Sequence, residues 1–213
     1  MILRVNEITL KNATDHLAQR DPALAMVIEK YGYPPLWARE PGFPALVHII
    51  LEQQVSLASA KAAFNRLETH LAGEVTPANF LNINDDTLLK IGFSRQKKIY
   101  TRALASAVLN GDFNFDLLPD MPDPILRTYM KSLKGIGDWS VDIYALMCLQ
   151  RPDVLPKGDI ALYESFKVLY ALNERPNYDT FEAYAQDWQP YRSIAARILW
   201  HFYLCERDNK PRK

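Results

Sequence analysis

The sequence predicts an all-helical fold. Apolar residues recur at the three- and four-residue spacing of an amphipathic helix in eight segments, and the alternation typical of strands is almost absent. Of the 213 residues, 48% are hydrophobic and 23% are charged, which is typical of globular proteins and excludes disordered or collagen-like chains. A chain of this length buries a core without disulfides, so we expect one large domain or two small ones that share a core.

The ends of the predicted helices are marked by glycine and proline. In chain order, the helices are predicted at residues 23–31, 43–51, 57–71, 97–109, 124–133, 139–149, 160–172 and 193–204. Gly73, Gly92 and Gly111 each follow an apolar segment, as glycine does where a helix ends. Most prolines fall in connections or in first turns. Only residues 1–10, with apolar side chains at positions 3, 5, 8 and 10, predict a short extended segment.

Composition also excludes several functional classes. The 25 basic and 25 acidic residues give no net charge, so any nucleic-acid site must be a local basic surface on a neutral protein. Cys148 and Cys205 are too few for a disulfide framework, and four scattered histidines offer no spacing for a transition metal. We see neither a secretory signal nor an apolar run that would span a membrane, and we therefore expect a cytoplasmic protein.

The most informative stretch is Leu133–Ser140, which reads LKGIGDWS. Gly135 and Gly137 flank Ile136 between two predicted helices, and glycine permits both a positive φ and close approach of the backbone to a ligand. We expect a tight hairpin in which Ile136 fills the space between the helices and the amides point outward. The N-terminus of the second helix then forms an anion site. An ordinary turn between antiparallel helices is the alternative, and the motif alone does not exclude it.

Four further elements accompany this hairpin. Asp159 follows the loop LPKG at 155–158 and precedes an apolar helical segment. Upstream lie ILEQQVS at 50–56 and GFSRQKK at 92–98, and downstream lies YRSIA at 191–195 with Trp200. In this order the elements resemble those of the helix-hairpin-helix DNA glycosylase superfamily, in the compact 3-methyladenine DNA glycosylase II branch. The resemblance covers residues 43–200, about three quarters of the chain.

This resemblance implies two helical lobes with a DNA- and base-binding cleft between them. Residues 1–40 and 160–213 would form one lobe, and residues 41–159 would form the other, with the hairpin at 133–139. The implied activity is hydrolysis of the N-glycosidic bond of a damaged base flipped out of double-stranded DNA, the first step of base excision repair. The resemblance further implies a monomer that acts in the bacterial nucleoid or the eukaryotic nucleus.

Asp159 is the expected catalytic residue. An aspartate before an apolar helical segment most often caps the helix. The same ionised carboxylate is also suited to stabilise the oxocarbenium ion that develops when the base leaves. No second carboxylate holds a motif position from which to protonate the leaving base. Because alkylated purines such as 3-methyladenine and 7-methylguanine already carry a positive charge, they need no such acid and are the favoured substrates.

Differences between this sequence and other branches of the superfamily limit the reactions and cofactors that the resemblance implies. Iron–sulfur relatives carry four cysteines, and this chain has two, so no cluster is expected. Bifunctional relatives place a Schiff-base lysine two residues after the second hairpin glycine, where this chain has Trp139, which implies no lyase activity. The family hairpin holds a monovalent cation, sodium or potassium, on backbone carbonyls that correspond here to Lys131, Leu133 and Ile136.

The resemblance assigns further residues to DNA and to the flipped base. DNA contacts are expected from Lys134, Gly135, Ile136, Gly137, Arg95 and Lys98. Gln54 holds the position whose side chain fills the gap left by the flipped base. Its neighbour Gln53 is expected to make a hydrogen bond between helices. Ser56 is expected to cap the next helix. The candidate walls of the base pocket are Trp139, Trp200, Phe43 and Tyr144, and each is equally suited to be a core residue.

Two alternatives remain open. In a noncatalytic helix-hairpin-helix DNA-binding module, Asp159 would only cap its helix and the aromatic residues would only pack. A glycosylase of the same superfamily with a different lesion as its substrate would keep the site but not the substrate. Release of free base from methylated DNA would distinguish the glycosylase from the noncatalytic module. Excision measured over a panel of different lesions would distinguish an alkylpurine glycosylase from one with another substrate.

Overall fold

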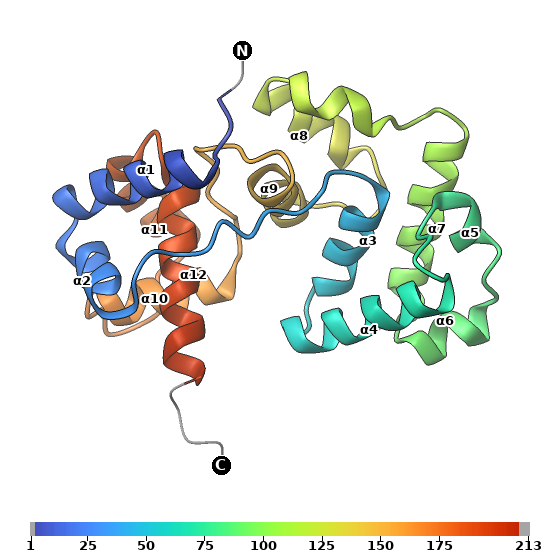
Figure 1. Ribbon diagram of the computed structural model, residues 1–213, viewed down its shortest axis with the longest axis horizontal. Helices are drawn as coiled ribbons and strands as arrows, with labels where there is room; N and C mark the ends of the chain where they lie inside the picture. The colour runs from blue at the N-terminus through green and yellow to red at the C-terminus, as the bar shows by residue number, and fades with distance from the viewer. Residues whose placement is uncertain (1–2, 209–213) are drawn as a thin grey trace. The chain divides into compact units, whose positions relative to one another are not determined.

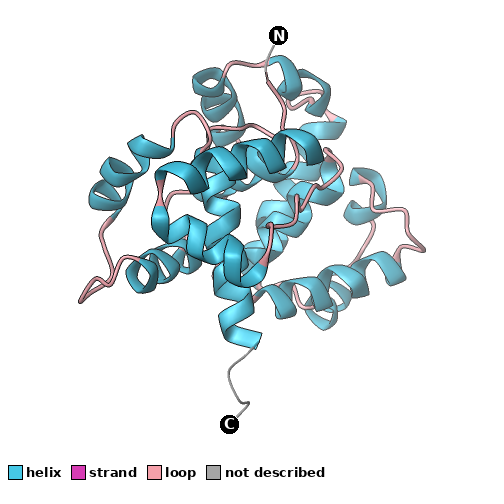
Figure 2. Cartoon of the chain, turned by 60° about the vertical axis from the view of Figure 1, so that its left-hand side comes forward, coloured by secondary structure: helices cyan, strands magenta, loops and turns pink. Residues whose placement is uncertain are grey.

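A computed structural model describes residues 3–208 and confirms the all-helical fold (Figure 1). The described residues form twelve α-helices and two 3-10 helices and contain no strand (Figure 2). They group into two compact units, and the division passes through α9 (Asp138–Met147). The central unit is Arg39–Tyr144, and the terminal unit joins the described residues before Arg39 to those from Ala145 onward. None of the described helices has the length and apolar composition that a membrane span needs.

The central unit contains α3 to α8 and the first part of α9. Its helices are α3 (Phe43–Glu52), α4 (Leu57–His70), α5 (Pro77–Leu81), α6 (Asp85–Ile91), α7 (Arg95–Leu109), the 3-10 helix η1 (Phe115–Asp120) and α8 (Asp123–Lys131). Helix α3 is the centre of this unit, because nearly all of its side chains are buried and it packs against both α4 and α7. Serine side chains cap α4 and α7, with Ser56 accepting from Ser59 N at 3.2 Å as expected.

The terminal unit is built around the long helix α12 (Arg192–Asp208), which packs against α1, α2 and α10. The other helices of this unit are α1 (Glu7–Arg20), α2 (Pro22–Tyr31), α10 (Ile160–Leu169), α11 (Tyr178–Ala185) and the 3-10 helix η2 (Gln186–Trp188). Helix α12 thereby brings together segments that are distant in sequence, the N-terminal helices α1 and α2 and the later helix α10.

All eight predicted helices are present, with ends shifted by a few residues. The prediction of an extended segment at residues 1–10 is wrong for residues 7–10, which form the first turn of α1. The reason is a reciprocal capping box, in which Thr9 N donates to Asn6 Oδ1 at 2.9 Å and Asn6 N donates to Thr9 Oγ1 at 2.7 Å. Residues 1–2 of that segment lie outside the described residues. The predicted helical segments do not include four of the helices, α1, α5, α6 and α11.

Asp21 ties three parts of the terminal unit together. Its Oδ1 accepts from Ala23 N at 3.0 Å and so caps α2, while its Oδ2 accepts from Tyr170 Oη at 2.6 Å and Trp188 Nε1 at 2.9 Å. The carboxylate is buried, and Trp188 is fully buried within a cluster of aromatic rings from α10 and α11. A single buried charge therefore satisfies donors from three separate segments.

We predict that Asp21→Ala lowers the free energy of unfolding by about 3 kcal/mol, because it removes the acceptor of the part-buried Tyr170 hydroxyl and of the buried Trp188 indole and also removes the α2 cap. Urea denaturation followed by tryptophan fluorescence measures this loss. Asp187→Ala, at an exposed aspartate of η2, is the matched control and is expected to change stability by less than about 0.5 kcal/mol. Equal effects of the two substitutions would contradict the role given to Asp21.

Candidate active site

The glycine-containing stretch forms a tight hairpin between α8 and α9 within the central unit. Gly135 has a φ of +87°, and the Ile136 amide donates to the Leu133 carbonyl at 3.2 Å. The Ile136 side chain is 6% exposed, so it packs between the helices as the sequence predicts. Lys134 and Gly137 are exposed, whereas Leu133 is buried. The hairpin therefore exposes Lys134 and Gly137 around a buried apolar anchor, while Gly135 between them is partly covered.

Gly135 is required for two independent reasons. Its positive φ is a conformation that side chains rarely adopt. In addition, a Cβ atom at this position would lie 2.2 Å from Cγ of Tyr100, a ring on α7. Gly137 differs on both counts, since its φ is not positive and nothing lies within 4 Å of an added Cβ. The two glycines of the motif thus have different roles.

The side-chain amide of Gln53 joins the end of α3 to the hairpin. Its Nε2 donates to the Gly135 carbonyl at 3.0 Å and to Ser140 Oγ at 3.0 Å. The sequence predicts for Gln53 a hydrogen bond between helices that closes the break before Ser56, and the bonds found instead join the end of α3 to the hairpin and to α9. On the other side of the same helix end, Lys97 Nζ donates to the Leu51 carbonyl at 2.6 Å. Burial lowers the pKa of Lys97, and the negative end of the α3 dipole favours its charge at this place.

A buried ion pair completes this helix end. Glu52 is 7% exposed, and it accepts from Arg39 Nη1 at 2.9 Å and from Arg39 Nη2 at 2.6 Å. His48, one turn earlier, stacks on the Phe64 ring with a centroid distance of 4.5 Å, and burial lowers the pKa of its imidazole. These contacts fix the residues on either side of the turn that begins at Gln53.

Gln54 follows this anchored helix end and is exposed, with a φ of +57°. A left-handed conformation in a non-glycine residue is strained and persists only where the neighbouring structure imposes it. Val55 and Leu57 beside it are also exposed, by 45% and 51%. The candidate wedge residue therefore lies at the tip of a short exposed turn, on an anchored base.

The cations predicted to meet DNA differ in their surroundings. Arg95 is exposed in the first turn of α7. Lys98 Nζ lies 2.9 Å from Asp85 Oδ2, and Arg102 also contacts this carboxylate at 3.0 Å. The hydrogen bond from Lys98, reinforced by Arg102, holds the pKa of Asp85 below its usual range. Lys98 is thus partly neutralised by an ion pair, whereas Arg95 projects from the start of its helix.

Acidic residues near the hairpin are neutralised by α8. Asp138 Oδ1 accepts from Lys131 Nζ at 2.9 Å and from Arg127 Nη1 at 2.9 Å, and the Lys131 hydrogen bond in particular lowers the pKa of Asp138. Arg127 also pairs with the buried Asp142. Together with Lys134, these side chains place three cations against two carboxylates, so the hairpin keeps a local positive charge within a neutral chain.

The aromatic candidates of the central unit are not equivalent. Trp139 is partly exposed at the second position of α9. Tyr144 is fully buried, and its hydroxyl accepts from the Gly42 amide at 2.9 Å. Phe43 is 5% exposed and packs edge-on against Phe80 with a centroid distance of 6.2 Å. The contacts of Phe43 and Tyr144 are those of core residues that support the start of α3.

Asp159 lies in the terminal unit and caps α10. Its Oδ1 accepts from the Leu162 amide at 3.1 Å, as the sequence predicts for a cap, and from Trp200 Nε1 at 3.2 Å. Trp200 projects from α12 and is 8% exposed. Two neighbouring elements therefore fix the orientation of the carboxylate through hydrogen bonds.

Two residues that the sequence analysis did not select lie around Asp159. Tyr163 Oη accepts from the Gly158 amide at 2.9 Å, which braces the turn before Asp159. Burial raises the pKa of Tyr163, and the charge of Asp159 adds to this shift. Trp37 meets Trp200 edge-on, with a centroid distance of 6.4 Å and an interplanar angle of 72°. A tryptophan in the proline-rich, non-helical segment 33–42 was the available signal.

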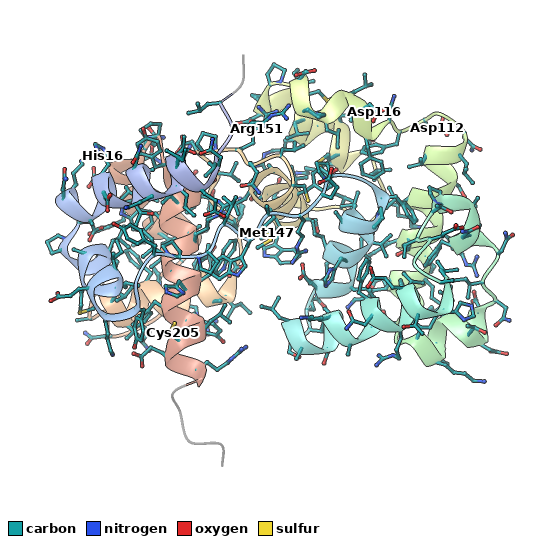
Figure 3. All side chains as sticks on the ribbon, in the orientation of Figure 1. His16, Asp112, Asp116, Met147, Arg151 and Cys205 are labelled. Atoms are coloured by element: carbon teal, nitrogen blue, oxygen red, sulfur yellow. The ribbon has the colours of Figure 1, made fainter. Side chains whose placement is uncertain are left out.

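The histidines and cysteines are spread over the chain, and His201 and Cys205 share α12, where Cys205 Sγ lies 3.8 Å from His201 Nδ1. His16 lies on α1 and Cys205 on α12 (Figure 3), and neither cysteine forms a disulfide. Within residues 3–208, no group of three or more histidine, cysteine, aspartate or glutamate side chains is arranged to hold a metal ion.

Comparisons with known proteins agree with these features. Residues 47–190 match the family model of the HhH-GPD superfamily base excision DNA repair protein. The chain is 26% identical over 206 residues to the alkylbase DNA glycosidase-like protein mag2 of Schizosaccharomyces pombe, which covers 94% of this chain and 97% of that protein. It is also 25% identical over 215 residues to DNA-3-methyladenine glycosylase 1 of the same yeast, over 95% and 92% of the two chains.

The fold is similar to that of solved structures. The S. pombe 3-methyladenine DNA glycosylase Mag1, solved in complex with abasic DNA, superposes with a TM-score of 0.84 at 25% identity and covers 89% of this chain and 95% of its own. A DNA-3-methyladenine glycosidase of Bacillus halodurans superposes with a TM-score of 0.73 at 27% identity and covers 92% and 91%. The similarity therefore extends over most of both chains.

We predict that Gly135→Ala destabilises the protein by about 2–4 kcal/mol, because the added methyl group meets Tyr100 and the positive φ becomes strained. Gly137→Ala is the matched control, and it is expected to unfold within about 1 kcal/mol of the wild type. The difference is measured as the shift in urea midpoint between the two variants. Equal stability of the two alanine variants would contradict the assignment of the steric requirement to Gly135.

Proposed function

Because this chain belongs to the HhH-GPD superfamily of base excision DNA repair proteins, we propose that it is a monofunctional DNA glycosylase that removes alkylated purines. The bases we assign to it are 3-methyladenine and 7-methylguanine. The observation that carries the proposal is the Asp159 carboxylate, which is held at the N-terminus of α10 by the Leu162 amide and the Trp200 indole. The catalytic, pocket and DNA-contact roles given below are parts of this proposal.

Asp159 acts through its charge. Departure of the base leaves an electron-poor sugar with oxocarbenium character, and a fixed anion beside it stabilises that transition state. The carboxylate is oriented before substrate arrives, so little reorganisation is needed at the moment of reaction. The same carboxylate accepts a proton from the attacking water as the new C–O bond forms. The base leaves with the electron pair of the C–N bond, which gives free base and an abasic site.

The positive charge of the leaving base replaces the proton that a second carboxylic acid donates in other glycosidases. A purine methylated at N3 or N7 carries a positive charge while it is attached to the sugar, and it becomes neutral when it departs with the bonding electrons. Protonation by a general acid is therefore unnecessary. This reasoning favours cationic purines over neutral lesions, and it agrees with the names of the similar proteins, which are 3-methyladenine or alkylbase glycosylases.

Contacts to DNA are assigned to the hairpin and to the turn after α3. The amides of Gly135 and Gly137 would bind a DNA phosphate, with Lys134 beside them and Ile136 as the buried anchor of the hairpin. Arg95 and Lys98 would extend the basic surface. Gln54 would enter the space of the flipped base, where its amide can pair with the orphaned partner. Trp200 and Trp139 would form walls for the base, supported by Tyr144 and Phe43.

The hairpin also has donors that suit a monovalent cation. The carbonyls of Lys131, Leu133 and Ile136 are neutral oxygens from one turn, a donor type that sodium and potassium accept. The Leu133 carbonyl accepts one hydrogen bond, from the Ile136 amide, and a carbonyl has a second lone pair for an ion. A bound cation would add positive charge beside the phosphate. We further propose a monomer that acts on double-stranded DNA in the nucleoid or the nucleus.

We predict that Asp159→Asn reduces excision of 7-methylguanine by about 100-fold or more, because the amide preserves the helix cap but loses the negative charge. Single-turnover release of labelled base from methylated duplex DNA measures this loss. Asp153→Asn is the control, because Asp153 lies in the preceding loop and pairs with Arg192 Nη2 at 2.9 Å. The control is expected to retain excision. A noncatalytic DNA-binding module would show no excision in any of the three proteins.

A second prediction concerns the fate of the DNA. Strand cleavage by a glycosylase requires an amine nucleophile at C1′, and Trp139 occupies the position of that lysine in bifunctional relatives. Borohydride is therefore expected to trap no enzyme–DNA adduct, and strands are expected to remain intact until alkali is added. Excision of 7-methylguanine is expected to exceed that of hypoxanthine, uracil or 8-oxoguanine. A trapped adduct, or faster excision of 8-oxoguanine, would contradict the assigned chemistry.

A further inference from the structure

Arg197 is a fully buried cation on α12 in the terminal unit. Its Nε donates to the Leu36 carbonyl at 2.9 Å, its Nη1 to the Ser193 carbonyl at 3.2 Å, and its Nη2 to the Leu146 carbonyl and to Gln150 Oε1, both at 2.9 Å. All four acceptors are neutral. Burial lowers the pKa of the guanidinium to about 10, so it remains charged at neutral pH. A buried charge paired only with neutral oxygens stabilises a fold less than an apolar side chain of similar volume would. A contribution to stability alone therefore does not explain an arginine at position 197.

The Leu36 carbonyl precedes a strained residue. Trp37 has a φ of +47°, a conformation that is costly for a bulky side chain and persists where neighbouring contacts impose it. The segment 33–42 contains no regular helix until α3 begins. The hydrogen bond from Arg197 Nε to Leu36 is thus a fixed point directly before the strained residue, and it connects this segment to α12 across 161 positions of sequence.

The Trp37 ring lies against the Trp200 ring. The two indoles meet edge to face, at a centroid distance of 6.4 Å, which is a favourable aromatic geometry. Trp200 lies one turn after Arg197 on the same helix, so both side chains come from one face of α12. Trp200 in turn donates its Nε1 hydrogen to Asp159 Oδ1. A continuous chain of contacts therefore runs from Arg197 through Leu36 and Trp37 to Trp200 and Asp159.

We infer that Arg197 is a positioning residue of the base site: by holding the Leu36 carbonyl, it keeps Trp37 edge-on against Trp200 and so fixes the indole that is bonded to Asp159. The inference rests on the proposed function, because it assigns Arg197 and Trp37 to the same excision reaction. Arg197 acts through the indole pair and contacts neither the base nor the sugar.

Arg197→Lys is the discriminating substitution. Lysine keeps the charge at the end of the side chain for the Leu146 carbonyl, but it has a methylene group where arginine has Nε, so the hydrogen bond to Leu36 is lost. Excision of 7-methylguanine under single-turnover conditions is expected to fall by roughly 10–100-fold, while affinity for an undamaged duplex stays within about twofold of the wild type. In the absence of DNA, the near-ultraviolet circular dichroism signal of the indole pair, defined by the difference between wild type and Trp37→Ala, is expected to be lost.

Arg192→Lys is the matched control, because it removes the same guanidinium fork from the same helix. Arg192 pairs with Asp153 and makes none of the described contacts to residues 36–37. The control is expected to retain both the excision rate and the indole signal. If Arg192→Lys lost them as Arg197→Lys does, a general loosening of α12 would explain both variants and the inference would be overturned.

A double-mutant cycle tests whether Arg197 acts through Trp37. In the Trp37→Ala background, Arg197→Lys is expected to slow excision by no more than about twofold further, because its target is already gone. Fully additive effects would overturn the inference.

If Arg197→Lys does not fold, Trp37→Ala alone decides, since a wild-type excision rate in that variant overturns the inference. If the wild type releases no base, the proposed function fails, and the dichroism comparison still tests the link from Arg197 to the indole pair.

Discussion

The Gln53 side-chain amide is the interaction on which the arrangement of the central unit's candidate DNA surface depends. It joins the C-terminal end of α3 to Gly135 in the hairpin and to Ser140 in the first turns of α9. Since α3 is also fixed by Lys97 at Leu51 and by Arg39 at Glu52, the position of the hairpin relative to Gln54 is determined by hydrogen bonds. One amide thereby couples the proposed phosphate contact to the proposed wedge, and Gly135 must lack a side chain so that the hairpin can approach α7 closely enough.

Two carboxylates of the terminal unit share one structural motif, and only one of them is a candidate catalytic group. Asp21 and Asp159 are both helix caps that also accept from a tryptophan indole, Trp188 in one case and Trp200 in the other. Asp21 is surrounded by packed aromatic rings and is explained by structure alone. Asp159 lies after an exposed turn at Lys157 and Gly158, and its indole partner belongs to a second aromatic contact, with Trp37. The same local motif thus serves as a core device at one helix and as a candidate catalytic group at the other.

The sequence was sufficient where local rules decide the outcome. Helical periodicity predicted α3 and α12, the Gly-Ile-Gly pattern predicted the hairpin with Ile136 buried, and the aspartate before an apolar segment predicted the α10 cap. It failed for residues 7–10, where alternation suggested a strand and the Asn6–Thr9 capping box imposed a helix. It did not select Trp37 or Arg197, because their significance arises from contacts between residues about 160 positions apart. Periodicity and spacing contain no information about such contacts, and the same limit left Tyr144 undecided between core and pocket.

A neutral chain can still present a basic surface, because acidic residues differ in how completely they are neutralised. Asp138 and Asp142 are paired with Arg127 and Lys131, and Asp85 is paired with Lys98 and Arg102. These carboxylates contribute little field beyond their own cations, since opposite charges at such distances largely cancel at longer range. Lys134 at the hairpin tip and Arg95 at the start of α7 are exposed on the same unit. The equal count of 25 basic and 25 acidic residues therefore describes the whole chain but not the hairpin, where the proposed phosphate contact through backbone amides would need only a modest local excess of positive charge.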